Sequence, residues 1–132
     1  MFGKRKPPPI KSLIAPGTRI EGHVQFRDGL RVDGEVAGDL KAPTGEPSIL
    51  VISEQAQVSG RVEADHVIIN GTVRGPVLAR ELLELQPKAR IEGDVTYKAL
   101  EMHQGATIAG RLQPLLGEDA EKPTLKLAAI NA

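Results

Sequence analysis

The amino-acid sequence predicts an all-β solenoid, in which one chain winds into about six coils of three short strands each. The first reason is a pentapeptide, aliphatic–x–Gly–x–aliphatic, that recurs along the chain. The second is the regular spacing of its glycines. The third is composition: the chain has 14 Gly and 10 Pro, and aromatic residues make up only 2%. A helical bundle tolerates few Gly and Pro residues, and ordinary cores use more aromatic side chains.

Length, charge and cysteine content exclude several classes of protein. The 132 residues correspond to one domain. Seventeen basic and 17 acidic side chains give zero net charge, which argues against nucleic acid as a partner. The absence of Cys excludes a disulfide framework, thiolate metal sites and Cys-based catalysis. Because no run of 18 apolar residues occurs and no apolar segment follows the first basic residues, we expect neither a membrane span nor a cleaved signal peptide.

Residues 1–16 are expected to form a disordered, basic tail. This segment has no acidic residue, and its cations are Lys4, Arg5, Lys6 and Lys11. The three prolines at 7–9 lack a backbone N–H and favour an extended conformation, so they act as a stiff spacer.

The start of this tail suits contact with an anionic membrane surface. Met1 and Phe2 stand beside Lys4, Arg5 and Lys6. Each cation near an anionic surface contributes about 1 kcal/mol, and burial of Phe2 adds about 1.5–3 kcal/mol. Phe rather than Gly at position 2 excludes N-myristoylation. The alternative is a solvated segment without a partner.

Residues 17–113 contain the pentapeptide repeat. Its copies begin at Ile20, Val32, Val36, Val58, Ile69, Val73, Ile91 and Ile108. The two aliphatic residues lie four positions apart and therefore face the same side of a strand. We expect the glycine to point inward with them, where its missing side chain lets the strand bend around a narrow core. The residues between face water.

The spacing of the glycines gives the length of a coil. Gly22, Gly38, Gly60, Gly75, Gly93 and Gly110 follow one another at steps of 16, 22, 15, 18 and 17 residues. Stacked coils of about 17–18 residues fit three short strands. The longest step contains the turn-rich segment 43–47, which we expect to form a loop. An antiparallel sandwich is the alternative, but its turn glycines would not lie inside alternating aliphatic segments.

Two further segments need separate treatment. Residues 78–85 have high helix propensity, but we expect a turn and a strand there, because the repeat resumes at Ile91 and a helix would interrupt the stacking. Residues 114–132 contain Pro114 and Pro123 and are expected to form a flexible tail.

No catalytic, cofactor-binding or metal site is predicted. A trimeric solenoid enzyme is the alternative, either a hexapeptide acyltransferase or a carbonic anhydrase. Aliphatic residues do recur every six positions over 67–91, but the residues that follow them are not small: Ile68, Arg74, Arg80, Gln86 and Glu92. His23, His66 and His103 lie 43 and 37 residues apart, so they would bind zinc only if the coils brought them together.

The ends of the predicted solenoid are the candidate functional surfaces. Terminal coils expose unpaired backbone groups and an apolar cross-section, and neither terminus offers an amphipathic helix to cover them. We therefore expect end-to-end self-association into filaments. The expected contacts are Ile20, Val24 and Phe26 in the first coil, and Ile108 and Leu112 in the last. The alternative is a monomeric adaptor whose own tails fold back over both ends.

The pentapeptides, together with the segment Ile14-Ala-Pro-Gly-Thr18 and the Met-Phe start, resemble those of a bactofilin over residues 13–113. This resemblance implies a single-stranded right-handed parallel β-helix that polymerises without nucleotide into bacterial cytoskeletal filaments. It implies a cytoplasmic location, with the N-terminal tail on the inner face of the cytoplasmic membrane. It also implies a scaffold that recruits cell-wall enzymes or other clients in cell shape or polar organisation. The family's polymer contact often includes an aromatic residue near the last coil, where this chain has Ile108 and Leu112.

Overall fold

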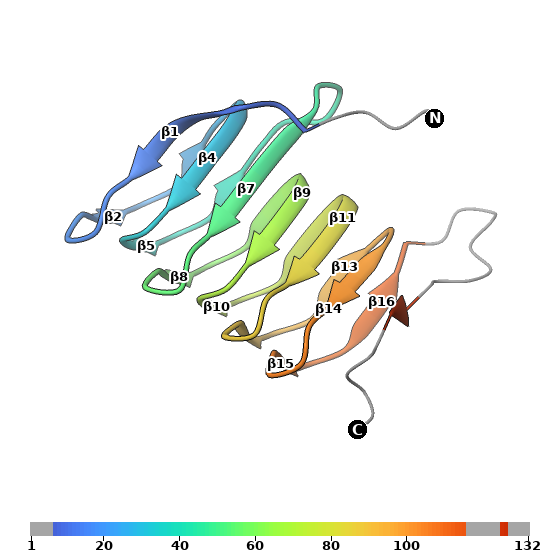
Figure 1. Cartoon of the computed structure of the whole chain (residues 1–132). Coiled ribbons are helices and arrows are strands. Elements are labelled where there is room, and N and C mark those ends of the chain that lie inside the picture. The colour runs from blue at the N-terminus through green and yellow to red at the C-terminus, as the bar shows by residue number, and fades with distance from the viewer. Residues whose placement is uncertain (1–6, 116–124, 127–132) are drawn as a thin grey trace.

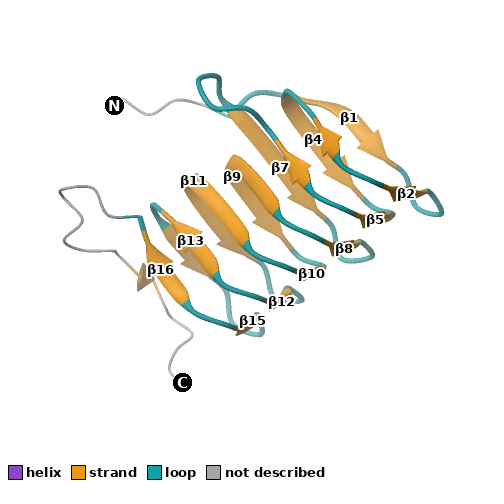
Figure 2. Cartoon of the chain, turned by 180° about the vertical axis from the view of Figure 1, so that it is seen from behind, coloured by secondary structure: helices purple, strands orange, loops and turns teal. Residues whose placement is uncertain are grey.

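A computed structural model describes residues 7–115 and 125–126 of the chain. It confirms the predicted all-β parallel solenoid of about six coils (Figure 1). The described residues contain no helix (Figure 2). We number the coils 1 to 6 from the N-terminal end. Each coil contributes one strand, or half of a long strand, to each of three faces.

Each face is a parallel sheet that runs the length of the rod. Face 1 contains β1 (Ile10–Ile14), β4 (Asp28–Val32), β7 (Ser48–Ile52), the second halves of β9 (Val62–Ile69) and β11 (Val77–Leu85), and β14 (Leu100–Met102). Face 2 contains β2 (Arg19–Glu21), β5 (Glu35–Ala37), β8 (Gln57–Ser59), β10 (Thr72–Arg74), β12 (Arg90–Glu92) and β15 (Thr107–Ala109). Face 3 contains β3 (Val24–Gln25), β6 (Leu40–Lys41), the first halves of β9 and β11, β13 (Val95–Tyr97) and β16 (Leu112–Pro114). A further strand, β17 (Leu125–Lys126), pairs with β14.

The core is a set of aliphatic columns parallel to the rod axis. On face 2 one column consists of Ile20, Val36, Val58, Val73, Ile91 and Ile108. On face 3 the equivalent column consists of Val24, Leu40, Val62, Val77, Val95 and Leu112. Residues of the middle coils are 0–2% exposed, and burial of each such side chain contributes about 1.5–3 kcal/mol. The period-two alternation inferred from the pentapeptides is therefore confirmed.

The expected inward orientation of the pentapeptide glycines was wrong. Gly75 lies between β10 and β11, at the corner between face 2 and face 3, with φ +149°. A Cβ built on Gly75 would lie 2.2 Å from the carbonyl oxygen of Gly60 in the preceding coil. The missing side chain thus makes room along the axis for the neighbouring backbone rather than inside the core. The same contact links all six glycines of the predicted series: Gly22, Gly38, Gly60, Gly75, Gly93 and Gly110.

The corner between face 3 and face 1 differs from the glycine corner. Residues 43–47 form a turn-containing loop between β6 and β7, as expected. In coils 4 and 5 the chain crosses the corresponding corner without a break. Residues 78–85 belong to a single strand, β11, so the predicted strand is confirmed but the predicted turn is absent.

Arg80 holds this continuous corner together. Its side chain is 16% exposed. Its Nε donates to Asp65 Oδ1 at 2.8 Å, Nη1 donates to Glu63 Oε2 at 3.1 Å, and Nη2 donates to the Ala42 carbonyl at 2.8 Å. One guanidinium therefore joins three successive coils, with the charge-assisted geometry that stabilises buried arginine.

The β-helix begins earlier than the expected boundary at residue 17. β1 starts at Ile10 and pairs with β4, Leu13 opposite Arg31 and Ile14 opposite Val32. Ile14 is 7% exposed and belongs to the core. Residues 10–14 thus form the first strand of coil 1 rather than part of a tail, because their aliphatic side chains extend the columns of face 1.

Candidate functional site

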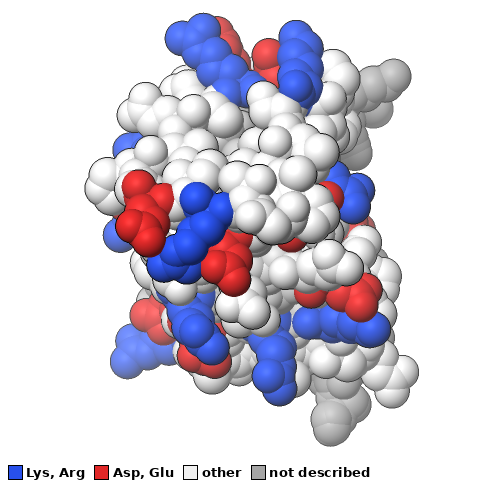
Figure 3. All heavy atoms as spheres, turned by 90° about the vertical axis from the view of Figure 1, so that its left-hand side faces the viewer, with Lys and Arg blue, Asp and Glu red and all other residues white. Residues whose placement is uncertain are grey.

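The N-terminal end of the rod leaves core positions uncovered. Ile20 and Val24 are half-buried, whereas Val36 and Leu40, their column neighbours in coil 2, are 2% and 0% exposed. All four side chains point inward, so the difference arises because, among the described residues, no other coil packs against the outer side of coil 1. Figure 3 views this end and shows uncharged atoms across its centre, with Lys, Arg, Asp and Glu side chains around it.

The C-terminal end has the same property to a greater degree. Ile108 is half-buried and Leu112 is 46% exposed. Their column neighbours in coil 5, Ile91 and Val95, are 1% and 0% exposed. Leu115, directly after β16, is 38% exposed. The two ends are therefore apolar cross-sections of the same narrow core.

Phe26 differs from the other predicted contact residues because it is only 8% exposed. It follows β3 and donates its backbone N–H to the Lys41 carbonyl, so it lies beside Ala42 of coil 2. The same column continues through Ala64 and Ala79 and ends at Tyr97. The small alanines of the middle coils leave room for a ring near each end.

Sequence reasoning missed two exposed apolar residues at the N-terminal end. Ile10 is 43% exposed and Leu13 is 57% exposed. Both lie in β1, which was assigned to the tail. The alternation of Leu13 with the buried Ile14, directly before the Pro16-Gly17 turn, was the signal that could have placed them.

Backbone groups at the open edges point away from the rod. On face 3 the N–H groups of Val24, Leu40, Val62, Val77 and Val95 each donate to the next coil. Leu112 occupies this position in coil 6, and the described chain has no further strand on face 3. Pro114 occupies the position in coil 6 that corresponds to Phe26 in coil 1 and Ala42 in coil 2. The backbone N–H groups of Phe26 and Ala42 donate to the next coil, whereas proline has no N–H. This edge therefore offers few donors, so apolar contact contributes more of any association there.

The described part of the C-terminal segment covers one face only. β17 pairs with β14 on face 1, with Leu100 opposite Leu125, and Leu100 is 3% exposed. On faces 2 and 3 the strands of coil 6, β15 and β16, are the last described strands of their sheets. Within residues 7–115 and 125–126, the tails therefore do not close the C-terminal end.

The charged side chains at the N-terminal end form exposed ion pairs. Arg19 Nε lies 3.0 Å from Glu21 Oε2, and Arg19 Nη1 lies 2.9 Å from Glu35 Oε1. Hydrogen bonds to Glu21 and then to Glu35 raise the pKa of the Arg19 guanidinium above its usual value. These exposed pairs keep the outer surface hydrated and add little to stability.

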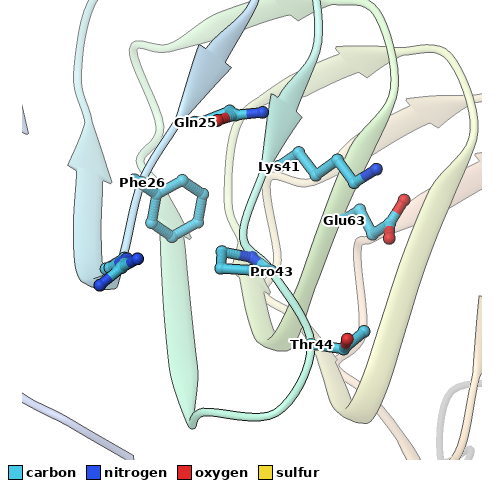
Figure 4. Close-up of a pocket in the computed structure, with 7 residues that line it drawn as sticks. Gln25, Phe26, Lys41, Pro43, Thr44 and Glu63 are labelled. Atoms are coloured by element: carbon cyan, nitrogen blue, oxygen red, sulfur yellow. The ribbon is translucent and has the colours of Figure 1, made fainter.

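A hollow in the described surface lies beside the loop at 43–47. It has a volume of about 620 Å³ and is lined by Gln25, Phe26, Arg27, Lys41, Pro43, Thr44 and Glu63. Figure 4 shows the rings of Phe26 and Pro43 on its walls and the side chains of Lys41 and Glu63 side by side. The Glu63 carboxylate accepts a hydrogen bond from Arg80. The carboxylate that lines this hollow is therefore already paired with a guanidinium.

The structure does not bring the three histidines together. His23 follows β2 in coil 1, His66 lies in β9 in coil 4 and His103 follows β14 in coil 6. His103 instead lies near Glu84 and Glu101, with possible ligand atoms within 4.8 Å of one another. His103 Nε2 is 3.3 Å from Glu84 Oε2, so the exposed imidazole and the half-buried carboxylate form an ordinary ion pair when the imidazole is protonated.

The predicted membrane-targeting residues Met1, Phe2, Lys4, Arg5 and Lys6 lie outside the described residues. In the part of the chain that the structure describes, no helix is long and apolar enough to cross a membrane.

Comparison with known proteins agrees with this architecture. The family model for bactofilins, described as polymer-forming cytoskeletal, matches residues 12–113. The bactofilin BacP of Myxococcus xanthus (strain DK1622) is 27% identical over 101 residues, which cover 76% of this chain and 40% of BacP. BacO from the same strain is 23% identical over 111 residues, which cover 84% of this chain and 85% of BacO.

The match thus spans less than half the length of BacP but most of BacO. No solved structure matches the chain. The family model covers almost the whole β-helix, including the six stacked glycines and both end coils. The chain therefore belongs to the bactofilin family of polymer-forming cytoskeletal proteins.

Proposed function

We propose that this non-enzymatic bactofilin assembles by end-to-end stacking of its β-helices, without nucleotide, through Ile20, Val24, Phe26, Ile108 and Leu112. The observation that carries this proposal is the contrast between the end coils and the middle coils. The same inward columns that are closed in the middle of the rod are open at its ends, and Leu112 is 46% exposed where Val95 is fully buried. A second rod restores the missing neighbour.

Assembly without nucleotide fits the chemistry of the described surface. Phosphate-binding loops combine glycines with a following Lys-Ser/Thr and a helix N-terminus. The segment 34–38 has the glycines but neither of the other two features, because the residue after Lys41 is Ala42 and residues 7–115 contain no helix. Apolar contact between preformed ends is sufficient to drive association.

We further propose that the N-terminal segment holds the filament on the anionic inner face of the cytoplasmic membrane. Three cations at about 1 kcal/mol each and the apolar Phe2 at about 1.5–3 kcal/mol give roughly 5 kcal/mol. This value corresponds to about tenth-millimolar affinity for one copy. A filament carries many such segments, and its effective binding is much tighter.

On the membrane the filament would act as a scaffold for cell-wall enzymes or other client proteins. The support for this part is the family resemblance together with the length of the rod surface, since stacked copies repeat every outward side chain at regular intervals.

Electron microscopy of the purified protein in nucleotide-free buffer tests the assembly. We expect filaments in which β-helices are stacked end to end. Compact trimers would instead support the enzyme alternative, and dispersed monomers at high concentration would support the capped adaptor.

Co-sedimentation with anionic liposomes tests the membrane contact. Deletion of residues 2–6 should release filaments from the liposomes while polymerisation continues. Continued pelleting of the deleted protein with liposomes would exclude this segment as the anchor.

A further inference from the structure

The outer surface of face 1 is unlike that of face 2. The outward column that begins at Leu13 continues through Arg31, Val51, Ile68, Glu84 and Glu101. A second outward column places Ile49 beside His66 and His66 beside Leu82. Val51, Ile68 and Leu82 are half-buried although they point away from the core. On face 2, by contrast, outward positions hold ion pairs such as Arg74 with Glu92. We call the outward residues Arg31, Val51, Ile68 and Glu84 the face 1 patch.

The order of side chains along this patch is self-complementary. From coil 2 to coil 5 it presents a cation, two aliphatic residues and an anion. A two-fold axis along the strand direction, between coils 3 and 4, would place Val51 of one copy opposite Ile68 of another. The same axis places Arg31 opposite Glu84 at both ends of the patch. Such a contact uses one surface on both partners and closes after two copies.

We infer that the face 1 patch joins two filaments side by side, with the rods antiparallel and a second copy of this chain as the partner. This inference rests on the proposed function, because it requires filaments. The antiparallel arrangement is favoured by charge. A two-fold axis along the rods would make them parallel and would place each coil opposite the same coil of the partner copy. Arg31 of one copy would then face Gly29 of the other rather than a carboxylate. Opposite charges select the register and orientation of such contacts.

The charged groups remain available for this contact. Arg31 donates through Nε to Asp33 of the same copy at 3.1 Å, and its side chain stays 51% exposed. The guanidinium therefore has further donors for a second carboxylate. The Glu84 side chain is 22% exposed, and its Oε2 lies 3.3 Å from both His103 Nε2 and the donating Gln86 Nε2. Its second oxygen, Oε1, remains for a guanidinium of the partner copy.

The size of face 1 limits the strength of one contact. Face 1 is about four residues wide along its strands, at about 3.3 Å per residue, and six strands long, at about 4.8 Å between strands. Its outer surface is therefore about 400 Å² per copy. Stable complexes bury about 800 Å² per partner, so isolated copies should not pair through this face. Filaments repeat the patch with every copy, and the many weak contacts act together.

Charge reversal on purified protein tests the inference. Filaments of R31E and of E84R should each form but lose side-by-side pairing, because like charges then meet at both ends of the patch. A mixture of separately assembled R31E and E84R filaments should pair again, since each variant now complements the other. The matched control R74E, on face 2, should pair like the unaltered protein.

Electron microscopy counts single and paired filaments, and circular dichroism reports whether each variant is folded. Unaltered filaments that stay single, R31E filaments that pair like the unaltered protein, or a mixture that stays unpaired would each overturn the inference. Absence of filaments from the unaltered protein would instead contradict the proposed function, and this inference with it.

Discussion

Substitution of Leu112 measures how much the exposed core contributes to assembly. Leu112 is 46% exposed in a single rod and lies in the column of Val95, which is fully buried. Complete burial of a leucine side chain is worth about 1.5–3 kcal/mol, so burial of the remaining half by a second rod is worth about 0.7–1.4 kcal/mol. Leu112→Ala should therefore raise the critical concentration about three- to tenfold, since 1.4 kcal/mol is about tenfold. Leu112→Arg should prevent assembly, because an unpaired charge in a closed apolar contact costs several kcal/mol.

Sedimentation at a series of protein concentrations gives the critical concentration of each variant, and circular dichroism verifies the fold. Gln113→Arg is the matched control, because Gln113 neighbours Leu112 in β16 but pairs with Thr96 on the outward side of the strand. Assembly of Leu112→Arg at the concentration of the unaltered protein would refute the assignment of this end as a contact surface.

Three further predictions concern the fold. Gly75→Ala should lower the free energy of unfolding by about 1–3 kcal/mol, because a Cβ there meets the Gly60 carbonyl oxygen at 2.2 Å with φ at +149°; an unchanged urea midpoint would contradict the role of the glycine column. Arg80→Met should lower the free energy of unfolding, measured in urea, by about 1–3 kcal/mol, because it leaves two half-buried carboxylates without their donor. A variant more stable than the unaltered protein would show that apolar packing at this corner outweighs the hydrogen bonds. Burial raises the pKa of Tyr97, so the stability it contributes is complete below the unfolded value near pH 10 and is lost as pH rises through the folded pKa. Thermal melts above pH 10 should show this loss, and Tyr97→Phe should reduce it.

The repeat could be predicted from the sequence because its period is a property of neighbouring residues. Aliphatic residues four apart define one side of a strand, and the spacing of Gly22, Gly38 and the later glycines defines the coil. The orientation of those glycines could not be predicted in the same way. It depends on a contact between Gly75 and the carbonyl of Gly60, fifteen residues earlier, and no local pattern distinguishes a residue inside a strand from one at a corner.

The limits of the β-helix were harder to predict than its interior. Ile10–Ile14 form a strand only because β4 is present to pair with them, and the preceding prolines suggested a tail. Residues 78–85 illustrate the opposite case, in which helix propensity is overridden by pairing with β9 on both sides of the corner.

The candidate end surfaces followed from topology, but the burial of individual residues there did not. Ile20, Val24, Ile108 and Leu112 are all at least partly exposed, as an open cross-section requires. The shielding of Phe26 depends on the alanines of its column, Ala42, Ala64 and Ala79, which provide room for its ring.

Cryo-electron microscopy of the filament tests end-to-end stacking most directly. If coil 6 of one copy meets the end coil of the next at the ordinary spacing of strands, six coils at about 4.8 Å give an axial length of about 29 Å per copy. We predict this value, with β-strand spacing continuous across each junction. A filament in which the rods lie across the axis, or in which a gap separates Leu112 from the neighbouring copy, would contradict the account.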